Sequence, residues 1–282
     1  MDAVVLEPAL DAKLTQLRAA LAALPNALVA FSGGVDSSLL LRVASEVLGS
    51  RVMALTTVSP TNPEEDTLAA VALAAALGVT HVIVDSNELE IPRYAANPTN
   101  RCYLCKDRLY EICAAEAKTR GLGALLDGVN VDDLGDYRPG LRAAEEHGVR
   151  HPLVEAGLRK AELRVVSRAL GLGTWDKPAS PCLSSRFPYG TEITLERLRM
   201  VAGAEAALRA LGFREVRVRF HGELARIEVG AAELDRFADG ALRAAAVRGV
   251  RDAGFRHVTV DLDGFRSGSL NEGVTRPARA HA

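Results

Sequence analysis

The chain has 282 residues, of which 48% are hydrophobic and 25% are charged, with a formal net charge of −2. This composition is that of a folded protein with room for one sizeable core and a second small domain, and it excludes a disordered chain. The weak net charge gives no general attraction to polyanions, so we expect a small-molecule substrate and neither a nucleic-acid nor a membrane partner.

The N-terminal segment and the hydropathy pattern predict a cytoplasmic protein. No stretch reaches the roughly 20 continuous apolar residues of a membrane span. The start MDAVVLEPALDAKL has no basic segment followed by an apolar signal core. Four cysteines in that compartment are expected to be buried thiols, metal ligands or redox groups instead of a disulfide framework.

Strand-like and helix-like segments alternate along the first half of the chain. Short apolar runs occupy residues 27–31, 51–58, 81–86 and 124–130, and helical periodicity occupies residues 37–49, 63–78 and 109–121. Each helical segment ends at a glycine, which suits a helix C-cap. This order predicts an α/β fold with a doubly wound parallel sheet, whose ligands bind beyond the carboxyl ends of the strands.

The run SGGVDSS follows the first predicted strand and begins the first predicted helix. Adjacent glycines let the backbone turn sharply and direct N–H groups at an anion, and the helix adds the positive end of its dipole. No Gly-Lys-Ser/Thr follows and no third glycine is present, which excludes the kinase-type loop and the dinucleotide fingerprint. For two glycines alone, a plain turn with an N-cap serine is the alternative.

The full run resembles the PP-loop of the adenine-nucleotide α-hydrolase family, in which ATP is cleaved between its α and β phosphates. The resemblance implies that Asp36 helps to position Mg²⁺. It further implies that the leaving pyrophosphate is held by Ser32, Gly33, Gly34, Ser37 and Ser38. Thr57 and Gly128 are further candidate residues for binding the nucleotide cofactor.

Three of the four cysteines are candidate ligands. Cys102 and Cys105 form a C-x₂-C pair, and Cys182 lies in the loop ASPCLSSR. A C-x₂-C turn lets two thiolates meet one metal or cluster, and a third ligand leaves one coordination position open. A [4Fe-4S] cluster with three cysteine ligands is consistent with this set, while zinc and a pair of incidental thiols are the alternatives. Cys113 is expected on the apolar side of its helix, in the core.

The C-terminal part predicts a smaller α+β domain. Residues 195–213 read as a helix, 215–229 as a β-hairpin turning near His221-Gly222, and 257–264 as a last strand after a helix that ends near Gly254. Alternation places Arg217 and Arg219 on one face, and a two-residue turn at that position pairs Arg217 with Arg226. Two arginines that face each other repel unless an anion lies between them, so this pairing suggests a phosphate site. A solvated charge mosaic with the neighbouring glutamates is the alternative.

Four further stretches, in this order behind the PP-loop, narrow the resemblance: LDGVNVDDLGDYRPGLRAA, ASPCLSSRFPYGT, VRVRFHGELARIE and FRHVTVDLDGFRSGSLN. With them the chain resembles the LarE family from about residue 14 to 271. These are ATP-dependent sulfurtransferases that make the nickel-pincer nucleotide cofactor of lactate racemase. The family adenylates a carboxylate of a nicotinate-derived mononucleotide, and sulfur then displaces AMP to give a thiocarboxylate.

The resemblance implies roles for several residues. Arg217 and Arg219 match arginines that bind the substrate phosphate, and Arg186 matches an active-site arginine. Asp133 and Glu205 match acidic positions that can bind metal. The resemblance also implies a homo-hexamer, and the sulfur donor that reloads the site is not readable. We expect a PP-loop domain over residues 1–180, a substrate-binding and sulfur-transfer domain over 181–275 and a disordered tail over 276–282.

One departure from the family bears on the source of sulfur. In its best-known branch a single cysteine gives up its own sulfur and becomes dehydroalanine, but Pro181 stands at that position here and Cys182 is displaced by one. The chain therefore resembles the three-cysteine branch, which implies a [4Fe-4S] cluster on Cys102, Cys105 and Cys182. A sacrificial role for Cys182 remains open.

Three other functions fit parts of the sequence less well than this one. A tRNA thiolase of the PP-loop class also uses three cysteines and a cluster, but the weakly acidic chain shows no RNA-binding extension. An ATP-binding signalling module would have no use for the three cysteines and the strand arginines. An amidotransferase-type ligase would need a glutaminase or an ammonia-handling segment, and none is visible in the sequence.

Overall fold

The computed structural model describes residues 6–135 and 139–266, and the chain divides into two compact units. The first contains the chain up to Ile91 together with Asn100–Ser180, and the second contains Pro92–Thr99 together with the chain from Pro181 onward. The tail predicted over 276–282 lies outside the described residues.

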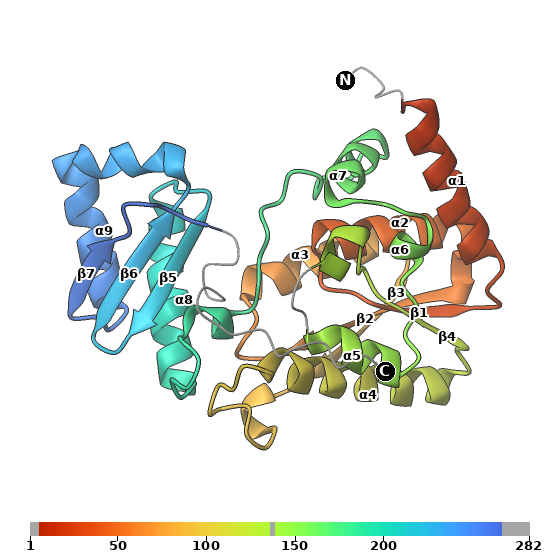
Figure 1. Ribbon diagram of the computed structural model, residues 1–282, viewed down its shortest axis with the longest axis horizontal. Coiled ribbons are helices and arrows are strands. Elements are labelled where there is room, and N and C mark those ends of the chain that lie inside the picture. The colour runs from red at the N-terminus through yellow and green to blue at the C-terminus, as the bar shows by residue number, and fades with distance from the viewer. Residues whose placement is uncertain (1–5, 136–138, 267–282) are drawn as a thin grey trace. The chain divides into compact units, whose positions relative to one another are not determined.

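The first unit is built on a parallel sheet (Figure 1). Its strands are β1 (Ala27–Ala30), β2 (Val52–Val58), β3 (Thr80–Asp85) and β4 (Ala124–Leu126), in the order β3-β2-β1-β4. Its helices are α1 (Pro8–Ala22), α2 (Val35–Leu48), α3 (Glu64–Ala76), α4 (Arg101–Arg120), α5 (Pro139–Glu146), α6 (Pro152–Glu155) and α7 (Lys160–Ala169). The architecture confirms the predicted α/β class with a parallel sheet.

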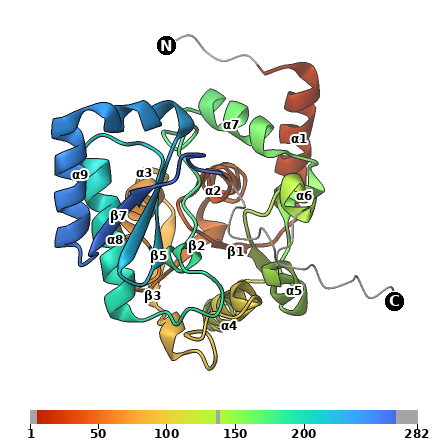
Figure 2. The ribbon, with the colours of Figure 1, turned by 60° about the vertical axis from the view of Figure 1, so that its left-hand side comes forward.

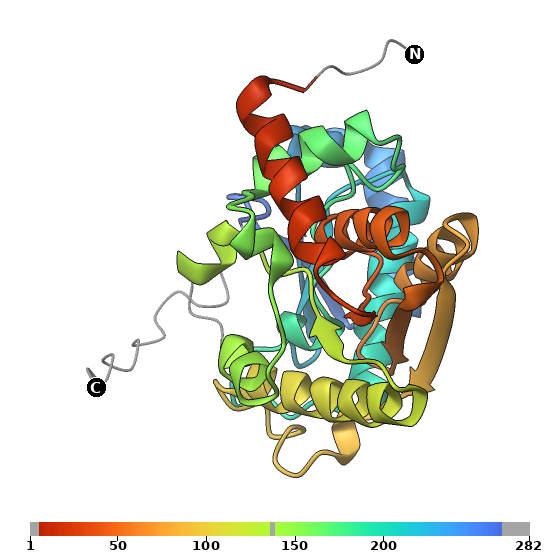
Figure 3. The same cartoon turned by 90° about the vertical axis from the view of Figure 1, so that its right-hand side faces the viewer.

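Alternation along the strands gives the sheet two buried faces. Ala27 and Val29 of β1 pack into a core with α1, α2, α3, α6 and α7, whereas Leu28 packs with Cys113 and Ala117 of α4. Figure 3 shows α4 and α5 together on one side of the strands, away from α1 and α2. Successive strand side chains point to opposite faces, so both layers follow from the apolar runs in the sequence. Cys113 is buried, as predicted.

Three predicted boundaries differ from the structure by four residues or more, and one of them is the last strand, expected over 257–264, which ends at Val260. The helix expected over 109–121 begins at Arg101, so the C-x₂-C pair lies in the first two turns of α4. The strand expected over 124–130 ends at Leu126. It ends there because the carboxylate of Asp127 accepts a hydrogen bond from the Val129 N–H at 3.1 Å, which turns the backbone away from the sheet.

The second unit is a three-stranded sheet with two helices on one face (Figure 2). It contains α8 (Leu195–Ala210), β5 (Val216–His221), β6 (Leu224–Val229), α9 (Gly240–Asp252) and β7 (His257–Val260). The strand order is β5-β6-β7, with β5 and β6 antiparallel and β6 and β7 parallel. This is the smaller C-terminal α+β element that the sequence predicts.

Candidate functional site

The loop between β1 and α2 has the geometry of an anion cradle. Gly33 has a φ of +68°, and a Cβ atom there would lie 3.0 Å from the Cβ of Ala70, so both the backbone and the neighbouring helix require glycine. Gly34 is the N-cap of α2, a helix of 14 residues, and no side chain caps that end with a hydrogen bond. The first N–H groups of α2 are therefore available for an anion at the positive end of the helix dipole.

The serines of the loop contribute mainly to its shape. The hydroxyls of Ser32 and Ser37 are 3.1 Å apart, and the Ser37 hydroxyl donates to the Gly34 carbonyl at 3.3 Å. Ser38 is fully buried, and its hydroxyl makes no hydrogen bond within the described part of the chain. The expected contact between pyrophosphate and this loop thus depends more on backbone N–H groups than on the hydroxyls of Ser37 and Ser38.

Gly128, beyond the end of β4, lies directly against the start of α2. A Cβ atom at Gly128 would come within 2.7 Å of the backbone nitrogen of Ser37, which no side chain can satisfy without displacing the backbone. Asp127 fixes this loop, because its carboxylate accepts hydrogen bonds from the Tyr110 hydroxyl at 2.7 Å and pairs with His151 at 2.6 Å. Gly128 therefore lies beside the PP-loop.

The pairing of buried Asp127 with partly exposed His151 shifts the pKa values of both groups. Burial alone raises the pKa of Asp127, but the hydrogen bond and charge of His151 outweigh it, so the net pKa of Asp127 is lowered. The hydrogen bond to Asp127 raises the pKa of His151. The hydrogen bond and the opposite charges thus favour the charged form of each group, and the pair connects the loop that carries Gly128 to His151.

Two lysines that the sequence analysis did not identify lie at the PP-loop. The ammonium group of Lys160, at the start of α7, lies 2.7 Å from both carboxylate oxygens of Asp36. Lys177 donates to the Gly33 carbonyl at 3.1 Å and pairs with Asp66 at 2.9 Å. Desolvation raises the pKa of Asp36, and the charge of Lys160 opposes that rise. No local pattern connects Lys160 to Asp36, which is 124 residues away.

The other predicted residues of the first unit lie around the same end of the sheet. Thr57 is near the end of β2, and its carbonyl accepts a hydrogen bond from Asn62 at 3.3 Å. Asp133 accepts one from the Asn130 N–H at 3.0 Å, and its negative charge contributes to the raised pKa of Asp36. The residues expected to bind nucleotide are thus gathered where parallel sheets bind ligands.

The cysteines differ in environment. Cys102 is exposed and Cys105 is partly exposed in the first two turns of α4, and because they are three residues apart they lie on one side of the helix. Burial raises the pKa of Cys113 to about 12, which makes it a core thiol. Cys182 is partly exposed and belongs to the second unit. Within each unit, no three His, Cys, Asp or Glu side chains of the described residues gather in an arrangement that could hold a metal ion.

Arg186 and Glu205 form a fully buried ion pair in the second unit. Arg186 donates to both oxygens of Glu205, at 2.7 and 3.0 Å, and the carboxylate also accepts from Arg209 at 2.9 Å and from the Val218 N–H at 3.0 Å. Burial raises the pKa of Glu205, but Arg186 outweighs it and the net pKa is lowered. These four bonds occupy the roughly four lone-pair sites of a carboxylate. Metal binding at Glu205, as the sequence suggested, does not fit this arrangement.

The hairpin register differs from the predicted one. The turn is Gly222-Glu223, so Arg217 pairs with Glu228 and Arg219 with Arg226. The predicted pairing of Arg217 with Arg226 is therefore wrong, because Gly222, with a φ of +67°, takes the first position of the turn instead of the second. Arg217, Arg219 and Glu228 on this face are buried while Arg226 is partly exposed, which does not fit a solvated charge mosaic.

The two strand arginines have different surroundings. Arg219 forms a forked pair with Glu228, at 3.0 and 2.8 Å, and donates to the Ser185 carbonyl at 2.8 Å. Arg217 donates to the Val216 carbonyl at 2.7 Å and lies over the ring of Phe265. Burial lowers the pKa of Arg217 to about 10, and the positive charges of Arg186 and Arg219 contribute to that decrease. A buried guanidinium among other cations attracts an anion.

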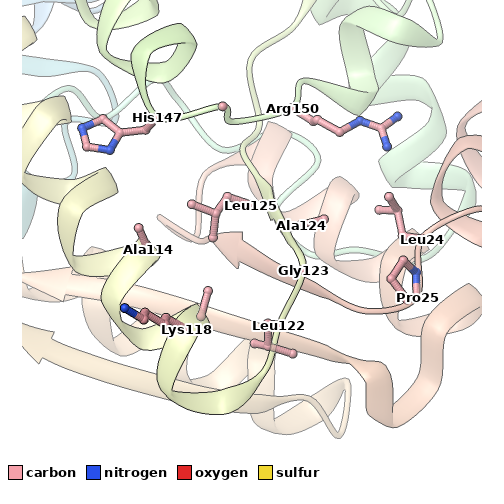
Figure 4. Close-up of a pocket in the computed structure, with 12 residues that line it drawn as sticks. Leu24, Pro25, Ala114, Lys118, Leu122, Gly123, Ala124, Leu125, His147 and Arg150 are labelled. Carbon is pink, nitrogen blue, oxygen red and sulfur yellow. The ribbon is translucent and has the colours of Figure 1, made fainter.

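A pocket of about 500 Å³ opens at the amino ends of β1 and β4 (Figure 4). Its lining includes Pro25 and Gly123, which precede those strands, and Lys118 of α4. Because the PP-loop lies at the carboxyl ends of the strands, this pocket is separate from the candidate nucleotide site. Among the described residues, no helix is long and apolar enough to cross a membrane.

Comparison with known proteins gives three findings. A family model for NAD synthase matches residues 14–104. The chain is 47% identical over 267 residues to an uncharacterized protein of Synechocystis, covering 95% of this chain and 100% of that protein. It is 40% identical over 268 residues to the pyridinium-3,5-bisthiocarboxylic acid mononucleotide synthase of Lactiplantibacillus plantarum, covering 95% and 96% of the two chains.

Proposed function

The chain belongs to the family of pyridinium-3,5-bisthiocarboxylic acid mononucleotide synthase, and we propose that it is the ATP-dependent sulfurtransferase of nickel-pincer nucleotide biosynthesis. The proposed substrate is pyridinium-3,5-biscarboxylic acid mononucleotide. The observation that carries the proposal is the identity of 40% across nearly the full length of both chains. The glycine turn at the start of α2 supports the use of ATP, as does the NAD synthase family match.

The proposed first step is adenylation of a substrate carboxylate. A carboxylate oxygen attacks the α-phosphorus of ATP, the bond to the bridging oxygen breaks, and pyrophosphate leaves. The N–H groups at the start of α2 would hold the leaving pyrophosphate, with the ammonium of Lys160 as a nearby cation. Asp36 is the proposed Mg²⁺ ligand, since carboxylate oxygen suits this ion, and Mg²⁺ would replace Lys160 there.

The proposed second step is attack of sulfur on the activated carbonyl carbon. The carbon–sulfur bond forms, the bond to the phosphate oxygen of the adenylate breaks, and AMP leaves with the electron pair. Adenylation makes this possible because AMP is a far better leaving group than the oxygen of a free carboxylate. We place Arg217 at the substrate phosphate, because its lowered pKa reflects a charge that an anion would stabilise.

The proposed route of sulfur involves Cys102, Cys105 and Cys182. Thiolates are the ligands that iron–sulfur clusters take, and none of the three cysteines is buried, which fits that donor set. A bound [4Fe-4S] cluster with three protein ligands would supply one iron with an open position for sulfide. The chain's own residues supply the thiolates and the backbone that holds them. Loss of sulfur from Cys182 itself is the alternative.

Two measurements test this proposal. The first is pyrophosphate release from ATP, which we expect to depend on the mononucleotide, with a thiocarboxylate product detected by mass spectrometry. No product with that substrate would refute the proposed reaction. The second is the content of iron and acid-labile sulfide in protein purified without oxygen. We expect about four of each per chain.

Variants make the second measurement specific. Cys102→Ala is expected to lose iron and sulfide, whereas Cys113→Ala, at a buried core thiol, is the matched control and is expected to retain them. Absence of iron and sulfide from all three proteins would refute the cluster. Loss of sulfur from Cys182 after one turnover, followed by mass spectrometry, would then support the sacrificial route.

A further inference from the structure

The segment Pro181–Arg186, here called the cysteine loop, is held by buried side chains although Cys182 itself is partly exposed. Leu183, Ser184 and Arg186 are buried, and Leu183–Arg186 forms a short 3₁₀ turn for which Cys182 is the N-cap. The Cys182 carbonyl accepts from the Ser185 N–H at 2.9 Å. The thiol is thus presented to solvent from a fixed backbone.

The fork of Arg186 divides its donors between two partners. Its Nε and one terminal nitrogen donate to Glu205, as described above. The two N–H groups of the other terminal nitrogen, Nη1, are shared among the Pro181 carbonyl at 2.8 Å, the Cys182 carbonyl at 3.2 Å and the Ser185 hydroxyl at 2.9 Å. One guanidinium therefore connects the peptide groups before and after Cys182 to Glu205 of α8.

Glu205 in turn fixes Arg186 in one orientation. Its carboxylate is also held by Val218 of β5 and by Arg209, one turn along α8, so the guanidinium plane is set by the sheet and the helix. A buried ion pair contributes little net stability, because desolvation offsets its attraction. A geometric role therefore explains this pair better than a contribution to overall stability.

We propose that Arg186 is a positioning residue for Cys182, acting through the backbone of the cysteine loop instead of through contact with the substrate. This rests on the proposed function insofar as Cys182 takes part in sulfur transfer. All three nitrogens of the planar guanidinium are used for this task, and the single nitrogen of a lysine ammonium cannot reach both Glu205 and the loop. Misplacement of a reacting group by about 1 Å can cost about 100-fold in rate.

The first test compares Arg186→Lys with Arg209→Ala, which removes another partner of Glu205 and keeps the hydrogen bonds from Arg186 to the cysteine loop. Hydrogen exchange of the amides of Ser185 and Phe187 is expected to become at least about tenfold faster in Arg186→Lys and to stay unchanged in Arg209→Ala. Unchanged exchange in Arg186→Lys would overturn the proposal. This measurement needs no substrate, so it stands whether or not the proposed reaction is observed.

The second test separates positioning from substrate contact. In Arg186→Lys, the rate of sulfur transfer is expected to fall about 10- to 100-fold, while KM for the mononucleotide and the rate of pyrophosphate release stay close to wild type. A raised KM with an unchanged sulfur-transfer rate would instead place Arg186 on the substrate and overturn the proposal. If Arg186→Lys does not fold, Glu205→Gln, which keeps the side-chain size and weakens the grip on Arg186, is measured with the same expected results.

Discussion

Arg217 and Arg219 lie two residues apart on β5, and we predict that their replacement by methionine has opposite effects on stability. The usual pKa of arginine is 12.5, and that of Arg217 is lowered to about 10, mainly by burial. The difference corresponds to about 3 kcal/mol of unfavourable charging in the folded state. Because the pKa of this base is lowered, the cost is present throughout the neutral range and is lost only as the pH rises through about 10.

The net effect of Arg217→Met on stability also depends on the favourable interactions of the arginine side chain that the substitution removes. Its hydrogen bond to the Val216 carbonyl contributes about 1 kcal/mol and its contact with the Phe265 ring about 0.5–1 kcal/mol. Removal of the charge should therefore stabilise the protein by about 1–2 kcal/mol and raise the midpoint of thermal unfolding by roughly 3–6 °C. Inorganic phosphate should stabilise the wild type more than this variant.

Arg219→Met is the matched comparison. It removes the guanidinium that donates to both carboxylate oxygens of buried Glu228. Arg226 then remains as the paired cation of that carboxylate. Breaking a buried pair in this way costs about 3–5 kcal/mol. Thermal unfolding at neutral pH, with and without phosphate, measures both variants. Equal destabilisation by the two substitutions, or equal phosphate stabilisation of wild type and Arg217→Met, would refute the reasoning.

Further predictions concern the loop that carries Gly128. Gly128→Ala should raise KM for ATP by at least about tenfold, because the new Cβ atom would meet the Ser37 backbone. Gly173→Ala is the control, since a Cβ atom there has nothing within 4 Å, and its KM should stay within about twofold of wild type. Pyrophosphate release measures KM for both variants. His151→Gln should destabilise the protein more at about pH 5.5 than at about pH 8.5, since stability from the raised pKa of His151 is lost as the pH rises through that pKa. Thermal unfolding at the two pH values measures this, and an effect independent of pH would contradict the assigned pairing with Asp127.

The mechanistic proposals divide between the two units. Residues proposed for ATP lie in the first unit, at the carboxyl ends of the strands and the start of α2. Arg217 and Cys182 lie in the second unit. Cys102 and Cys105, which are proposed for sulfur transfer, lie in the first unit as well. Measuring pyrophosphate and thiocarboxylate separately therefore assigns the failure of a substitution to adenylation or to sulfur transfer.

The sequence by itself determined the features that depend on neighbouring residues. Apolar runs of strand length and helical periodicity specified the parallel sheet, because burial of one face is a local pattern. The glycine turn was readable in the same way, since only glycine adopts the φ of Gly33 beside Ala70 without strain. The burial of Cys113 likewise followed from its place on an apolar helix side.

Tertiary structure alone decided which charges meet. Asp36 pairs with Lys160 across 124 residues, and Arg186 pairs with Glu205 from another element, so neither pair has a local signature. A shift of the hairpin turn by one residue changed the partner of Arg217 from an arginine to Glu228. Pairing energies depend on distance and burial, and packing of distant segments fixes both, which is why the roles of these charged residues became visible only in the fold.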